Sequence, residues 1–410
     1  MSTEYSKRYV DESLDLLMPH LPAMLLDGPK GVGKTSTASQ RVKTTVSLDR
    51  PSVADRVRKD PDWAVDQPKP ILIDEWHRAE PVWDSVKRAV DRDYSGGQFL
   101  LTGSLPTGST HSGAGRITSL RMRPMTLPER GVTTAEILLS TALQSGQFNV
   151  GGSSDWGIRD YLQEIVRSGF PAIRNLPLEA AYQTLQGYID RVVDSDIQDA
   201  GLNPRQPAKL RSWLAAYAAA TGTTASMNTI RAAASAGNES PSRAAIVPYV
   251  DTLTRLRILD ELAPWLPYGT SLQRLTVSSK HYLADPALAA VLTGFSVENA
   301  ITHDLTGALF EHLVALSLSV FADAANASVY HLRTRDGRQE IDFIIERADG
   351  KVIAIEAKLG ETVLEKDSKH LLWLKQQLGD RLLDIAIVNT GQYSWRTREG
   401  VAVIPLALLG

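Results

Sequence analysis

The sequence predicts an α/β protein with a parallel-sheet domain first, a helical domain in the middle and a mixed domain of strands and helices last. In the first part, short apolar strands alternate with helical segments, which is the pattern of a parallel sheet. Helix-type periodicity dominates the second part, and strands return in the third. A chain of 410 residues fits two or three domains. We therefore expect domains at residues 1–130, 131–295 and 296–410.

The composition is that of an ordinary soluble globular protein, with 43% hydrophobic and 22% charged residues. The net charge of −3 gives no general attraction to nucleic acid, so such binding would need a local basic patch. The absence of cysteine excludes disulfides and thiolate metal sites. The polar N-terminus lacks a signal-peptide core, and apolar runs such as ALAAVLTGF fall short of the roughly 20 residues of a membrane helix. We expect a cytoplasmic protein without a membrane segment.

The elements of the first domain follow from its apolar runs. Buried parallel strands are predicted at residues 24–28, 71–75 and 98–104, helices at 33–45 and 82–92, and a loop rich in Gly, Ser and Thr at 102–115.

The segment GPKGVGKT, residues 28–35, matches the phosphate-binding pattern G-x-x-x-x-G-K-[ST], directly after a strand and before a helix. Backbone N–H groups of such a loop surround phosphates, Lys34 would reach the β and γ oxygens, and the Thr35 hydroxyl would bind Mg²⁺. The alternative is a glycine-rich turn without a ligand. The candidate nucleotide-binding residues are Gly28, Pro29, Lys30, Gly31, Val32, Gly33, Lys34, Thr35 and Ser36.

A second motif, ILIDE at 71–75, ends a predicted strand with two acids. Ligands bind at the carboxyl edge of open α/β sheets, beside the phosphate loop. Asp74 would hold Mg²⁺ through water, and Glu75 would orient and deprotonate the attacking water. Alone, such a pair could equally cap a helix.

Two further groups could contact the nucleotide. Thr102 and Ser104 end the third predicted strand, where a polar side chain could contact the γ-phosphate; the alternative is a plain strand terminus. Arg116 could supply positive charge to a nucleotide, including that of a neighbouring subunit, or belong to a solvated basic face.

These motifs together with LLTGS, the following GR and RPMTLPE resemble prokaryotic AAA-type ATPases that carry a C-terminal domain of uncharacterised function. The resemblance extends through YIDRVVDSDI (188–197) and KHYLADPALAAVLTG (280–294) and ends in the segment 340–360. It implies ATP binding, a winged-helix-like middle domain, a restriction-endonuclease-like C-terminal domain and possible homo-oligomers. Trp76 and His77 depart from the Ile-Gln that usually follows the two acids.

Residues 340–360, EIDFIIERADGKVIAIEAKLG, predict a β-hairpin that carries charge among its isoleucines. Asp342, Glu356 and Lys358 fit the D…E-x-K set of metal-dependent PD-(D/E)xK nucleases. The two carboxylates would bind Mg²⁺, and the lysine would orient or help deprotonate the hydrolytic water. The alternative is a buried ion-pair network in a degenerate nuclease fold.

This site requires a particular turn. Opposed residues of an antiparallel pair share a face. A three-residue turn, 348–350, sets Asp342 opposite Glu356, whereas a two-residue turn puts them on different faces. Gly350 suits the left-handed position of the longer turn. Glu311, the acid of an otherwise apolar helix at 306–321, is predicted to complete the site, because a preceding helix often contributes an acid in this nuclease architecture.

The middle domain could bind DNA or RNA through a basic winged helix, with helix 243–257 interrupted by Pro248; the alternative is a packing or partner-binding domain. Its basic residues are Arg205, Lys209, Arg211, Arg231, Arg243, Arg255 and Arg257. Two functions follow. One is an ATP-regulated, nucleic-acid-processing enzyme, for example in genome defence. The other is an ATP-switched binding module with an inert nuclease fold that grips a protein or nucleic-acid partner, as in a toxin–antitoxin pair.

Overall fold

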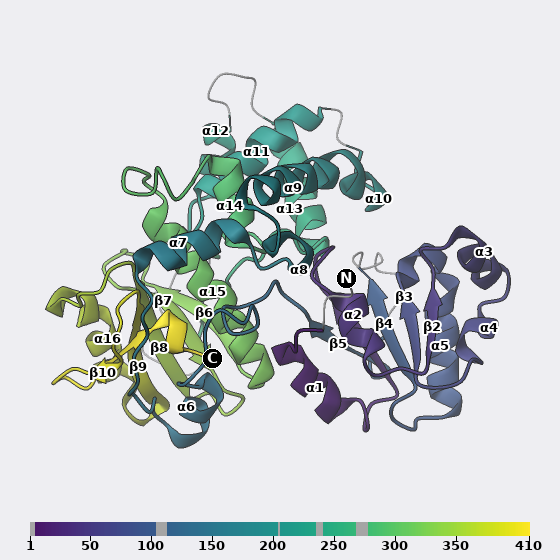
Figure 1. The fold of residues 1–410 in the computed structure, drawn as a ribbon, viewed down its shortest axis with the longest axis horizontal. Helices are drawn as coiled ribbons and strands as arrows, with labels where there is room; N and C mark the ends of the chain where they lie inside the picture. Colours follow the sequence, from purple (N-terminus) through teal and green to yellow (C-terminus); the bar gives the residue numbers. More distant parts are fainter. Residues whose placement is uncertain (1–4, 104–112, 204–205, 235–240, 268–277) are drawn as a thin grey trace. The chain divides into compact units, whose positions relative to one another are not determined.

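The computed structural model describes residues 5–103, 113–203, 206–234, 241–267 and 278–410 (Figure 1). Its contacts divide the chain into two compact units. The first is Met1–Arg123 with Arg255–Arg257, and the second is Pro124–Thr254 with Ile258–Gly410. Each unit is described by itself.

The first unit contains a five-stranded sheet in the order β2-β3-β4-β1-β5, with every pair parallel. The strands are β1 (Ala23–Asp27), β2 (Thr44–Ser47), β3 (Ile71–Asp74), β4 (Phe99–Gly103) and β5 (Ile117–Arg121). The helices are α1 (Tyr9–Leu17), α2 (Lys34–Ser39), α3 (Pro51–Lys59), α4 (Asp62–Val65) and α5 (Pro81–Arg92), with a 3₁₀ turn at Trp76–Ala79.

Both faces of this sheet are covered by helices. Alternate residues of a strand point to opposite faces, and β3 shows the result. Ile71 and Ile73 pack with the helices α3 to α5, whereas Leu72 packs with α1 and α2. Because all strands run in the same direction, their carboxyl ends meet at one edge. There, Asp27 aligns with Gly103, and Asp74 aligns with Thr102.

The helix predicted at 33–45 is wrong in its second half. Helix α2 ends at Ser39, and Thr44–Ser47 instead forms β2 beside β3. The segment TTV is β-branched throughout, which favours a strand on a half-buried edge.

The second unit combines helices with a six-stranded sheet in the order β10-β11-β9-β8-β7-β6. The helices are α6 (Leu139–Ser145), α7 (Ile158–Arg167), α8 (Pro171–Arg174), α9 (Leu178–Arg191), α10 (Ile197–Asp199), α11 (Pro207–Ala219), α12 (Met227–Ala233), α13 (Arg243–Arg255), α14 (Pro286–Thr293), α15 (Thr306–Ala324) and α16 (Glu365–Leu378), with a π-helical turn at Val192–Asp196. The strands are β6 (Ser328–Arg333), β7 (Glu340–Glu346), β8 (Val352–Lys358), β9 (Leu382–Asn389), β10 (Trp395–Arg396) and β11 (Ala402–Pro405).

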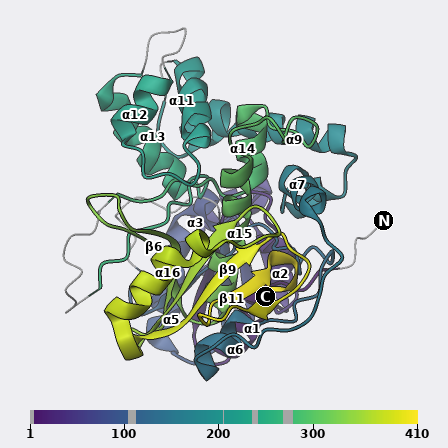
Figure 2. The same cartoon turned by 90° about the vertical axis from the view of Figure 1, so that its left-hand side faces the viewer.

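This sheet is mixed. β6, β7 and β8 are antiparallel neighbours, whereas β8 pairs in parallel with β9, and β9 in parallel with β11. Helix α16 lies across the sheet (Figure 2), where Leu371 and Leu374 pack with Ile344 and Ala354 of β7 and β8. Helix α15 contacts β6 and β8.

The β7–β8 hairpin has the three-residue turn that the sequence predicts. The backbone N–H of Arg347 donates to the carbonyl of Lys351 at 2.9 Å, and Gly350 has the left-handed φ of 79°. Phe343 pairs with Ile355, so the next residues outward, Asp342 and Glu356, stand opposite each other on one face.

Helix α15 alone among the described helices is long and apolar enough to cross a membrane by length and composition, with a mean hydropathy of 1.3 over its most apolar window. Of that window, 61% is buried inside the protein. A buried core helix meets the same criteria, and α15 packs against the sheet of the second unit.

A winged helix in the middle region stays a prediction. Helices α11, α12 and α13 are followed by isolated antiparallel bridges that join Leu259 to Leu283 and Leu262 to Lys280. The segment LQRLTVSS, residues 272–279, whose composition favours a further strand, lies largely outside the described residues. Helix α13 continues on both sides of Pro248.

Candidate functional site

The phosphate loop joins β1 to α2, and Lys34 is its central side chain. Lys34 is 5% exposed, and its Nζ donates to the carbonyls of Gly28 at 2.8 Å and Pro29 at 2.9 Å. Burial lowers the pKa of Lys34 to about 8, although the carboxylates of Glu75 and Asp27 oppose this change. The ammonium is therefore held inside the loop without full compensation of its charge.

The residues predicted to bind magnesium, Thr35 and Asp74, are in contact with each other. The Thr35 hydroxyl donates to Asp74 Oδ1 at 2.8 Å, and the Thr102 hydroxyl donates to the same oxygen. Hydroxyl and carboxylate oxygens are the ligands that Mg²⁺ prefers. These three side chains come from α2, β3 and β4, and they meet at the carboxyl edge of the sheet. Ser104 lies outside the described residues.

Glu75 follows Asp74 with a left-handed backbone, φ 56°, which is uncommon for a residue other than glycine. Burial raises the pKa of Glu75, and Asp74 adds to the effect, while Lys34 opposes it. The carboxylate lies 3.4 Å from Nε2 of His77. Sequence reasoning assigned His77 no role, and it also missed Asp27, which ends β1 close to Lys34.

Arg116 lies on the surface of the first unit. Its Nε is 2.6 Å from Asp91 of α5, and its side chain is 41% exposed. Within this chain it therefore pairs with an acid. Its predicted contact with a neighbouring subunit's nucleotide stays a prediction.

The second unit holds the acids of the hairpin in one buried cluster. Asp342 is 9% exposed, and its Oδ2 accepts the backbone N–H of Ala357 at 3.0 Å. Glu356 is 3% exposed, and its Oε2 lies 3.1 Å from Nζ of Lys358. The structure thus brings together the three residues of the predicted D…E-x-K set.

A residue that the sequence analysis did not select, Lys280, occupies the centre of this cluster. Its Nζ lies 2.8 Å from Asp342 Oδ1 and 2.9 Å from Glu311 Oε1, and the side chain is 1% exposed. The hydroxyl of Tyr282 donates to the same oxygen of Glu311. Glu311 therefore joins the acids as predicted, but the cation that it shares with Asp342 is an ammonium.

No group of three or more His, Asp or Glu residues in the described part of the chain is arranged to hold a metal ion. Sharing of one metal by Asp342 and Glu356 stays a prediction. In this structure, Lys280 and Lys358 supply positive charge to the two acids. Lys280 comes from outside the hairpin and contacts Asp342.

The pKa values of the cluster follow from this pairing. Burial would raise the pKa of Asp342, but the ammonium groups of Lys280 and Lys358 lower it to about 2. Burial and the charge of Asp342 raise the pKa of Glu311 to about 7 and that of Glu356 well above its usual range. Burial opposes protonation of Lys280, yet the two carboxylates raise its pKa.

The basic residues of the middle region are partly neutralised. Arg211 pairs with Asp190 at 3.0 Å and with Asp194 at 2.6 Å. Arg205 lies outside the described residues. Binding of nucleic acid by this region stays a prediction.

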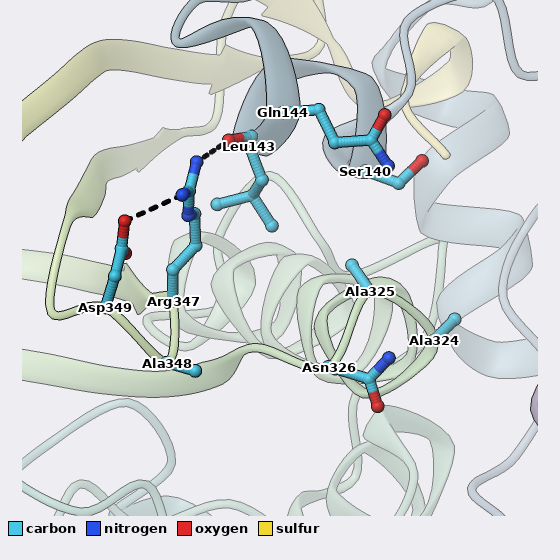
Figure 3. Close-up of a pocket in the computed structure, with 9 residues that line it drawn as sticks. All are labelled: Ser140, Leu143, Gln144, Ala324, Ala325, Asn326, Arg347, Ala348 and Asp349. Carbon is cyan, nitrogen blue, oxygen red and sulfur yellow. Dashed lines mark hydrogen bonds and ion pairs between the residues drawn. The ribbon is translucent and has the colours of Figure 1, made fainter.

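A separate pocket of about 610 Å³ opens at the turn end of the hairpin, the end opposite to Asp342 and Glu356 (Figure 3). Arg347 reaches across it, donating to the carbonyl of Leu143 and pairing with Asp349 at 2.7 Å. The arginine is thereby occupied by the protein itself.

Comparison with known proteins assigns the three regions separately. Residues 20–130 match the family model described as an AAA domain. Residues 158–299 and 306–409 match two domains of unknown function, DUF8612 and DUF4143. No curated protein matches the chain.

Among solved structures, a Walker-type ATPase of Pyrococcus abyssi is 12% identical over 70% of this chain and 96% of its own, with a TM-score of 0.41. The ORC2 protein of Aeropyrum pernix, solved as ADPNP–ADP complexes, is 13% identical over 72% of this chain and 92% of its own, with a TM-score of 0.27. The match of the family model identifies residues 20–130 as an AAA-type, ATPase-like domain, and residues 158–299 and 306–409 are similar to domains whose function is not known.

Proposed function

We propose that the protein binds and hydrolyses ATP in its N-terminal domain and that the C-terminal domain is a binding module that this ATPase switches. One observation carries the first part: Thr35 and Thr102 both donate to Asp74 beside the buried Lys34. Two strands, β3 and β4, and helix α2 thus bring three side chains together at one carboxylate oxygen, next to the phosphate loop.

Each side chain has a distinct role in this proposal. Lys34 neutralises the β and γ phosphates, and Thr35 with Asp74 would hold Mg²⁺, which supplies further positive charge to the phosphates when bound. Glu75 accepts a proton from the attacking water. Its raised pKa suits this task, because a general base works best when its pKa approaches the working pH. His77 orients the Glu75 carboxylate.

Substitution of Glu75 by Gln tests the hydrolytic role. We expect ATP affinity to be retained and turnover to fall at least ~100-fold, since general-base catalysis contributes roughly that much or more. Binding is measured with a fluorescent ATP analogue and turnover by phosphate release. Glu12→Gln, at an exposed acid on α1, is the control and should change neither. Unchanged turnover in Glu75→Gln would remove Glu75 from the mechanism, and absence of turnover in the wild type would refute the ATPase proposal.

The C-terminal domain has two candidate functions. The hairpin register favours a nuclease, because Asp342 and Glu356 share a face as that chemistry requires. Lys280 favours an inert, partner-binding module, because its ammonium sits between the acids. We propose the second, since a hydrolytic metal needs the position that this ammonium holds.

Cleavage assays separate these functions. Plasmid and single-stranded DNA are incubated with the wild type and with Lys358→Ala, in Mg²⁺ or Mn²⁺ and with ATP. We expect no cleavage by either protein. Cleavage by the wild type that is lost in Lys358→Ala would show the nuclease function and overturn our proposal for this domain. The ATPase assay is independent of this outcome.

A further inference from the structure

The side chain of Lys280 is held in place by its own backbone. Lys280 and Leu262 exchange two backbone hydrogen bonds, each 2.9 Å, in an isolated antiparallel bridge. Two residues further on, Tyr282 contacts Glu311 through its hydroxyl. These contacts place the ammonium of Lys280 beside the acids, and the lysine side chain is 1% exposed.

The acids need a cation. The buried carboxylates of Asp342 and Glu311 repel each other, and burial of a charge without a partner destabilises the folded state. The ammonium of Lys280 meets this need with two hydrogen bonds, 2.8 Å to Asp342 and 2.9 Å to Glu311. A divalent ion would meet it in the same position through carboxylate oxygens.

Glu356 is a third buried acid of this cluster, and it interacts with Asp342. Glu356 is 3% exposed, stands opposite Asp342 in the hairpin, and no donor among the described residues reaches its Oε1. An acidic oxygen buried without a donor is rare in a folded protein. It is available to a cation that would replace the ammonium.

We propose that Lys280 is the resident cation of this cluster and closes a latent divalent-cation site formed by Glu311, Asp342 and Glu356. With the lysine in place, the wild type binds no metal there. Without its charge, the three acids become a site for a hard divalent ion. All four residues belong to the second unit, and the site would form whether or not the first unit hydrolyses ATP.

The test is Mn²⁺ binding by the full-length, nucleotide-free protein, measured by electron paramagnetic resonance of free Mn²⁺. We expect Lys280→Ala to bind one Mn²⁺ per chain more than the wild type. The double variant Lys280→Ala/Asp342→Asn should lose this additional ion. Lys280→Arg keeps the charge and should gain none. Lys351→Met, at an exposed lysine of the same hairpin, is the matched control and should also gain none.

Thermal unfolding covers the case in which Lys280→Ala is unstable. We expect 1 mM Mn²⁺ to raise its melting temperature by several degrees more than that of the wild type. If Lys280→Ala is unfolded as purified, Mn²⁺ should restore its circular dichroism spectrum. The proposal is overturned if a folded Lys280→Ala gains no ion, if Mn²⁺ fails to restore an unfolded one, or if the wild type already binds an ion that Asp342→Asn removes.

Discussion

Replacement of Lys34 by Met should stabilise the nucleotide-free protein while it abolishes ATP binding. Burial lowers the pKa of Lys34 from 10.5 to about 8. At roughly 1.4 kcal/mol per pKa unit, the charged form costs the folded state about 3 kcal/mol. Methionine removes this cost, although the carbonyls of Gly28 and Pro29 lose a donor, worth about 1 kcal/mol each. We expect a net gain of about 1–2 kcal/mol.

The stability that Lys34→Met gains over the wild type should decrease as the pH rises. Below pH 8, Lys34 is charged in both the folded and the unfolded state, and the cost is complete. Between pH 8 and 10.5 the folded state releases the proton and the unfolded state keeps it, so the wild type gains stability with rising pH. The difference between wild type and Lys34→Met should therefore shrink from pH 7 to pH 9.5.

Hydrogen–deuterium exchange of β1, β3 and β4 measures this effect, because a chain of several domains does not unfold in two states. At pH 7, exchange of these strands should be about fivefold to thirtyfold slower in Lys34→Met. Lys43→Met, at an exposed lysine of the same unit, is the control and should stay within about 0.5 kcal/mol of the wild type. Faster exchange in Lys34→Met than in the wild type would refute the reasoning.

Two glycines give further predictions. A Cβ on Gly28 would lie 2.2 Å from the carbonyl oxygen of Met122, so Gly28→Ala should displace the phosphate loop and weaken ATP binding at least ~10-fold in a fluorescence titration, a loss of roughly 1.4 kcal/mol. Gly187→Ala, with no atom near its Cβ in α9, should leave that affinity unchanged. Gly350→Val should destabilise the hairpin by at least ~1–2 kcal/mol, because φ is +79°, and unchanged hydrogen–deuterium exchange of β7 and β8 would contradict the three-residue turn.

The local parts of both sites could be predicted from the sequence. The phosphate loop is a contiguous pattern, and the two-residue period of strands with Gly350 fixed which hairpin residues share a face. The structure confirms that Asp342 and Glu356 oppose each other. Such features depend on near neighbours, and elementary geometry is sufficient for them.

Lys280 could not be predicted in this way. It lies 31 residues from Glu311 and 62 from Asp342 along the chain. The segment that carries it forms isolated bridges and has no periodic pattern to reveal its direction. The only signal was a single lysine in the apolar and aromatic context of KHYLA. The end of α2 was missed for a related reason, because the pairing of β2 with β3 depends on a partner distant in sequence.

Lys34 and Lys280 are both buried, and they differ in how far nearby groups compensate their charge. Lys34 is 5% exposed and its pKa is lowered, because its carbonyl partners and nearby acids do not repay burial. Lys280 is 1% exposed and its pKa is raised, because two carboxylates more than offset burial. Because the charge of Lys34 is not fully compensated, binding of an anion such as a phosphate would stabilise it, as a nucleotide site requires. The charge of Lys280 is already neutralised by two carboxylates, so it would attract a phosphate only weakly. We therefore expect the hairpin cluster not to bind nucleic-acid phosphates while Lys280 stays between its acids.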